Sequence, residues 1–156
     1  MGATHVLAGA ALLFAAACTP GGIPAAGGGG GTNASTMTID VNLTLHAPTD
    51  TAFGRSGGYA PALAAVPVGS NIRFHNSDGF SHTATLIPGA SAFPDGSPFS
   101  VRAQIQTGSK ITDRWSSGTL AAGSTSQTIA VTSPGTYLFG CFFHYGSPMR
   151  AAIVAR

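Results

Sequence analysis

YLFGCFFHYGSPMRAAIV, residues 137–154, contains a cysteine, a histidine and a methionine in the spacing Cys-x2-His-x4-Met, at Cys141, His144 and Met149. These side chains offer a thiolate, an imidazole and a thioether, a ligand set that suits copper in both of its oxidation states. Taken alone, they could equally be a buried cysteine, a surface histidine and a core methionine. A copper site of this kind requires a second imidazole from elsewhere in the chain.

A second stretch, NIRFHNSDGFSHTATL at residues 71–86, supplies that imidazole. Its pattern indicates a strand, a polar turn at residues 76–79 and a second strand that begins at His82. Two histidines, one cysteine and a weak axial methionine form the ligand set of blue-copper electron-transfer sites. We therefore predict that one copper ion is bound by His82, Cys141, His144 and Met149.

Residues 36–156 resemble the plastocyanin-like cupredoxins. The resemblance lies in the Phe-x-Asn-x3-Phe-x-His pattern that ends at His82, in Pro-Gly-Thr-Tyr at residues 134–137, and in the ligand spacing itself. It implies an all-β fold, a Greek-key sandwich of about seven to eight strands, with His82, Cys141, His144 and Met149 as the copper ligands. It also implies that backbone amides donate hydrogen bonds to the cysteine sulfur and that Asn76 ties the two ligand loops together.

The sequence departs from the cupredoxin pattern in two places. Phe142 follows the cysteine and Phe143 precedes the histidine, where the family often has a small residue and a proline. Residues 88–117 align poorly with the family. The surface around the metal and one side loop are therefore expected to differ.

Alternating apolar and polar residues predict the strands of the sandwich. The first is expected over residues 37–45. Others are expected at residues 66–76, 82–87, 101–105, 128–132, 136–141 and 151–155. No long segment has a sustained helical period, and the 22 glycines and 10 prolines favour short strands joined by turns.

Composition argues against several function classes. A net charge of +2 is spread thinly over 156 residues, so nucleic-acid binding has no electrostatic support. Cys141 lacks the adjacent histidine that links the blue copper to a second metal in multicopper oxidases and nitrite reductases, and we find no acid–base pair. We expect a monomeric electron carrier, not an enzyme, that exchanges single electrons with redox partner proteins. An extracytoplasmic copper carrier is the alternative.

Residues around His144 suggest where an electron partner would dock. Phe142, Phe143, Tyr145 and Pro148 surround it in sequence and could form an apolar contact surface, with at least one phenylalanine expected in the core.

The N-terminal residues have the features of an export signal. Residues 6–17 are apolar, too few to cross a bilayer, and Ala15-Ala16-Ala17-Cys18 resembles the cleavage box of bacterial lipoproteins. We predict an export signal at residues 1–18, a flexible Gly-rich tether at residues 19–35 and a cupredoxin domain at residues 36–156. The mature protein would be periplasmic or at the cell surface, held to the membrane by lipid on Cys18. An ordinary cleaved signal and an uncleaved anchor are the alternatives.

Cysteine usage fits the same interpretation. Cys18 and Cys141 are the two cysteines of the chain, and lipidation of the first leaves the second without a partner. A metal-bound thiolate is the use we expect for Cys141, although a disulfide between the two is the alternative.

Replacing Cys18 with alanine is expected to release the protein from the membrane fraction, because the acceptor of the lipid is removed. Fractionation and mass spectrometry of the mature N-terminus would check this. An unmodified N-terminus elsewhere in the wild-type protein would contradict the prediction.

Overall fold

In strand β1, Thr36–Val41, the alternation of apolar and polar residues corresponds to one buried and one exposed face. Its inward residues Ile39 and Val41 are fully buried, while Thr36 and Thr38 are exposed. It pairs in parallel with β6, Asn71–Asn76, whose Ile72 and Phe74 are also fully buried. The computed structural model describes residues 34–156, and the predicted export signal and most of the predicted tether lie outside the described residues.

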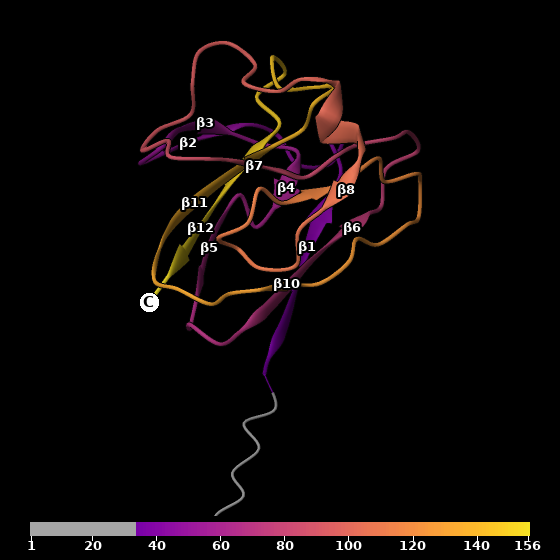
Figure 1. Ribbon diagram of the computed structural model, residues 1–156. Helices are drawn as coiled ribbons and strands as arrows, with labels where there is room; N and C mark the ends of the chain where they lie inside the picture. The colour runs from indigo at the N-terminus through magenta and orange to yellow at the C-terminus, as the bar shows by residue number, and fades with distance from the viewer. Residues whose placement is uncertain (1–33) are drawn as a thin grey trace, which may run out of the picture. The chain divides into compact units, whose positions relative to one another are not determined.

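The described residues form two main sheets and a short ribbon (Figure 1). The first sheet has the strand order β10-β6-β1-β4, with β10 at Ile129–Ala130 and β4 at Tyr59–Ala60. The second sheet has the order β5-β12-β11-β7-β9-β8. Its strands are β5 Leu63–Val66, β7 Thr85–Ile87, β8 Gln106–Thr107, β9 Ser116–Ser117, β11 Gly135–Gly140 and β12 Arg150–Ala155. The ribbon pairs β2, Thr49–Thr51, with β3, Gly54–Ser56.

The main core lies between the two sheets, so the fold is the all-β sandwich that the sequence predicts. Ile39 and Phe74 come from the first sheet, and Phe139 and Ile153 come from the second; all four belong to one buried cluster. Phe74 is central, with its ring centroid 5.3 Å from Phe139 and 5.7 Å from Trp115. Full burial of each such side chain stabilises the fold by about 1.5–3 kcal/mol.

A smaller apolar cluster covers the other face of the second sheet. Successive strand residues point to opposite faces, so Leu138 faces away from the main core that Phe139 enters. Leu138 packs with Phe93, Tyr145 and neighbouring residues of β7 and β12. Phe93 lies in residues 88–100, the first part of the segment 88–117 that aligns poorly with the cupredoxins. That segment therefore has a packing role that its sequence did not reveal.

Three predicted strands differ most from the observed ones, and those predicted at residues 82–87 and 128–132 are shortened to Thr85–Ile87 and Ile129–Ala130. The first strand ends at Val41, and Leu45, expected to be buried, is 71% exposed in a turn. The strand predicted at residues 66–76 begins only at Asn71, because the chain turns at residues 67–70 after β5 ends at Val66. The prediction of a strand at residues 101–105 is wrong. Val101–Gln104 is a 3-10 helix in which only Ala103 is buried.

Twelve strands are present in residues 34–156, more than the seven to eight expected, since seven of them have only two or three residues. Within the same residues, no helix has the length and hydropathy needed to cross a bilayer.

Candidate metal centre

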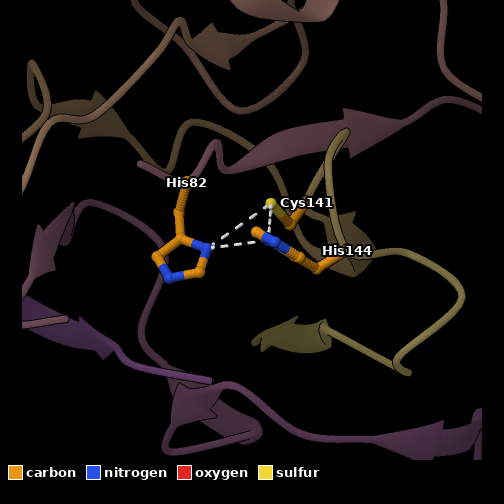
Figure 2. A group of neighbouring side chains, drawn as sticks. All are labelled: His82, Cys141 and His144. Atoms are coloured by element: carbon orange, nitrogen blue, oxygen red, sulfur yellow. Dashed lines mark hydrogen bonds between the residues drawn. The ribbon is translucent and has the colours of Figure 1, made fainter. Parts of the chain in front are cut away.

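Three of the four predicted ligands bring their donor atoms together. The Nδ1 atoms of His82 and His144 are 3.1 Å apart, and they lie 3.8 and 3.7 Å from Cys141 Sγ. Figure 2 shows the three side chains meeting from two segments of the chain, with one ring nitrogen of His82 facing the other two residues. Within residues 34–156, this is the one group of three or more His, Cys, Asp or Glu side chains with such close donor atoms.

The loop between β11 and β12 holds Cys141 and His144. β11 and β12 are antiparallel neighbours whose last pair is Gly140 with Arg150, so the loop starts and ends at adjacent points (Figure 1). The Cys141 amide donates to the Met149 carbonyl at 3.1 Å, and the Met149 amide donates to the His144 carbonyl at 3.3 Å. The spacing of the three residues is thus fixed by main-chain hydrogen bonds.

His82 is fixed separately. It pairs with Leu120 through two main-chain hydrogen bonds of 3.0 and 2.8 Å, just before β7 begins. Its side chain is fully buried. β7 is hydrogen-bonded to β11, so the two ligand segments belong to neighbouring strands of one sheet.

Thr83 ties the two ligand segments together. Its amide donates to Cys141 Sγ at 3.4 Å, and its hydroxyl accepts from the Phe142 amide at 2.9 Å. The expected amide donor to the sulfur is therefore present. Asn76, which the resemblance assigned to joining the loops, instead donates to the carbonyls of Phe80 and Leu120. The resemblance was wrong about Asn76, because the hydrogen bonds of its side chain go to its own turn and to Leu120, and not to the loop that carries Cys141.

Met149, the fourth predicted ligand, is fully buried on the same loop. It lies against the Gly57-Gly58 backbone, which it meets in a parallel bridge at Gly57. A Cβ atom on Gly58 would lie only 2.5 Å from Met149 Cγ, so the glycine leaves the room that this side chain occupies. Its role as a ligand stays a prediction.

Burial shifts the pKa values of Cys141 and His144. It raises the pKa of the Cys141 thiol, although the hydrogen bond from the Thr83 amide acts in the opposite direction. Burial also lowers the pKa of His144, and the neighbouring His82 lowers it further. A protonated thiol and a neutral imidazole are the result near neutral pH, so a metal ion would displace the thiol proton on binding.

The donor atoms fit a small metal ion. Bonds of about 2.0–2.3 Å to nitrogen and sulfur place the donors of a trigonal or tetrahedral site roughly 3–4 Å apart. The separations of 3.1, 3.7 and 3.8 Å lie in that range. A thiolate with two imidazoles suits copper and zinc, and a nearby thioether favours copper.

His144 is the predicted ligand that reaches the surface. It is half-buried, whereas His82, Cys141 and Met149 are fully buried. Phe143 beside it is 41% exposed. Tyr145 was expected on this surface, but it is only 2% exposed. The cause is its packing under residues 88–100, where its hydroxyl donates to the Pro94 carbonyl at 3.0 Å.

Phe80 is a surface residue that the sequence reasoning did not assign to this site. It is 44% exposed, and its ring centroid lies 4.9 Å from that of His82 and 5.5 Å from that of His144. The sequence did offer one indication of this role, because Phe80 belongs to the motif that ends at His82. Phe80 and Phe143 form the exposed apolar rim of His144.

Solved structures similar to this chain are cupredoxins. A purple cupredoxin from Nitrosopumilus maritimus is 16% identical, with a TM-score of 0.48, over 76% of this chain and 98% of that one. Dithionite-reduced auracyanin from Roseiflexus castenholzii is 19% identical, with a TM-score of 0.48, over 79% and 98%. Oxidised plastocyanin from Dryopteris crassirhizoma is 19% identical, with a TM-score of 0.46, over 77% and 100%. No family model and no curated protein sequence matches the chain. The role of each residue therefore rests on its contacts in this protein.

Replacing Gly58 with alanine is expected to destabilise the fold by about 2 kcal/mol or more, because the new methyl group overlaps Met149 and the backbone has a φ of +71°. Gly89 is a matched control, since its φ is +69° and no atom lies near a Cβ built there. Chemical denaturation would measure both variants. Equal losses would show that Gly58 makes no room for Met149.

Proposed function

We propose that residues 36–156 hold one copper ion through His82, Cys141, His144 and Met149 and pass single electrons between redox partner proteins. The observation that carries this proposal is the convergence of one thiol and two imidazole nitrogens, 3.1–3.8 Å apart, on two segments of one sheet. A bound copper ion supplies a one-electron couple, since it is stable as Cu(I) and Cu(II) in such a site.

Rigid support of the ligands favours electron transfer. Each ligand segment is held by main-chain hydrogen bonds, and Thr83 joins the two segments directly. Ligands held in this way move little when the metal changes charge. A small rearrangement keeps the barrier to electron transfer low.

The burial of the site supports retention of the metal. Three of the four proposed ligands have no exposed surface, which leaves no open face for a substrate to approach them. Copper carriage outside the cytoplasm is the second candidate, and it would require an ion that leaves readily. Loss of copper to a mild chelator within minutes would favour carriage over electron transfer.

The location of the protein is part of the same proposal. An export signal at residues 1–18 and lipid on Cys18 would place a monomeric copper domain outside the cytoplasm, tethered to the membrane. These residues lie outside the described part of the chain, so their sequence pattern is the support.

Replacing Cys141 with serine is expected to abolish the intense visible band of a thiolate bound to Cu(II), because Cys141 is the only cysteine among residues 34–156. Absorption spectra with Cu(II), before and after a reductant, would test the proposed function. Cys18→Ser is the control and should keep the band. A wild-type protein that binds Cu(II) without the band would overturn the proposal.

Replacing Phe143 with lysine is expected to slow electron exchange with a partner several-fold, because a charge would enter the apolar rim of His144. The copper spectrum should hardly change, since no ligand is altered. Val101→Lys is the control, because Val101 is 69% exposed on the 3-10 helix and is not a proposed ligand. Stopped-flow kinetics would compare the two variants. Slower exchange in Val101→Lys alone would place the exit for electrons elsewhere.

A further inference from the structure

Asp78 is a buried carboxylate in contact with the far side of His82. Its Oδ2 atom lies 3.0 Å from His82 Nε2, and the side chains of the two residues are 6% and 0% exposed. Nε2 is the ring nitrogen that faces away from Cys141 and His144, because Nδ1 is the atom that approaches both of them (Figure 2). Asp78 therefore touches a proposed ligand without reaching the metal position itself.

The carboxylate is held in place by several hydrogen bonds. Oδ2 also accepts from the Leu43 amide at 2.9 Å, and Oδ1 accepts from the Gly79 amide at 2.8 Å. The Asp78 amide donates to Asn76 Oδ1 at 3.0 Å, which fixes the turn. Main-chain amides that donate to a carboxylate favour its charged form, and the two that donate to Asp78 therefore support a negative charge on this side chain.

Among the described residues, no Lys or Arg side chain pairs with this charge. Within residues 34–156, His82 is the only cationic or titratable partner within salt-bridge distance of Asp78. Its remaining hydrogen-bond donors are two main-chain amides and the Thr44 hydroxyl, all neutral. The negative charge of Asp78 would therefore attract a cation bound at Nδ1, the other ring nitrogen of His82.

We infer that Asp78 is a positioning residue that orients His82 with its proton on Nε2 and its lone pair on Nδ1, and that its charge favours Cu(II) over Cu(I). This inference rests on the proposed function for its copper part. A neutral imidazole has one N–H and one lone pair. A carboxylate at Nε2 takes the N–H, which leaves the lone pair directed at Cys141 and His144. Partners of this kind orient metal-binding histidines and raise their basicity.

Charge counting gives the direction of the effect on copper. The Cys141 thiolate and Asp78 together carry two negative charges, which neutralise Cu(II) and leave one net negative charge with Cu(I). With asparagine at position 78, the site would carry one positive charge with Cu(II) and none with Cu(I). A buried net charge is unfavourable, so Asp78 stabilises the oxidised form and its removal disfavours that form.

The test compares Asp78→Asn with Asp50→Asn in the full chain. Asp50 is exposed in β2 and is not in contact with His82 through any hydrogen bond or ion pair of the described residues, so its variant makes the same change in net charge at the surface. Asp78→Asn is expected to weaken Cu(II) binding relative to Cu(I) binding by about tenfold, which raises the reduction potential by about 59 mV for a one-electron couple. Asp50→Asn should leave the ratio unchanged. Equal potentials in the two variants, or an equal loss of affinity for both copper ions, would overturn the inference.

A second measurement needs neither copper nor a variant that folds well. Nitrogen NMR of the metal-free wild-type protein, at a pH where His82 is neutral, should show its proton on Nε2. A proton on Nδ1 would overturn the inference. A wild-type protein without the visible copper band would instead refute the proposed function, and the NMR result would still decide whether Asp78 orients His82.

Discussion

The hydrogen bonds of Thr83 are the contacts on which the metal centre depends. One segment brings His82 and the other brings Cys141, and these residues are 59 positions apart. Thr83 joins the segments through its amide to the Cys141 sulfur and through its hydroxyl to the Phe142 amide. Its carbonyl accepts from the Tyr59 hydroxyl at 2.6 Å, which connects the same point to the core. The donor atoms come from distant parts of the chain, and their separation is fixed because Thr83 makes hydrogen bonds to Cys141, Phe142 and Tyr59.

Packing around the ligand loop adds a second constraint. Tyr145 lies between the predicted ligands His144 and Met149 in sequence, and its ring is covered by Phe99 and by the Arg150 guanidinium, 4.1 Å from the ring centroid. Its hydroxyl is bonded to Pro94. The segment at residues 88–100 therefore holds the outer side of the loop, while the main core holds the inner side. These contacts restrain the loop without any contribution from a metal.

The sequence was informative where the chemistry is local and less so where it depends on distant contacts. The spacing from Cys141 to His144 and the motif around His82 named donors that the fold brings together, because a short loop and a tight turn fix side chains over a few residues. The role of Thr83 depends on a partner far along the chain, which no local pattern indicates. Val101, Ala103 and Ile105 alternate like a strand, yet a 3-10 helix forms there, because so short an alternation does not distinguish the two.

The unequal burial of the four proposed ligands has a consequence for how the protein would choose its partners. His82, Cys141 and Met149 are enclosed, so the polypeptide insulates the centre in every direction except along the ring of His144. Electronic coupling falls steeply with distance through such an insulator, and a partner that docks elsewhere would be separated from the centre by the thickness of the sandwich. Selectivity can then be set by the few side chains around one imidazole. New partners could be acquired by changing Phe80 and Phe143 without altering the core or the ligands.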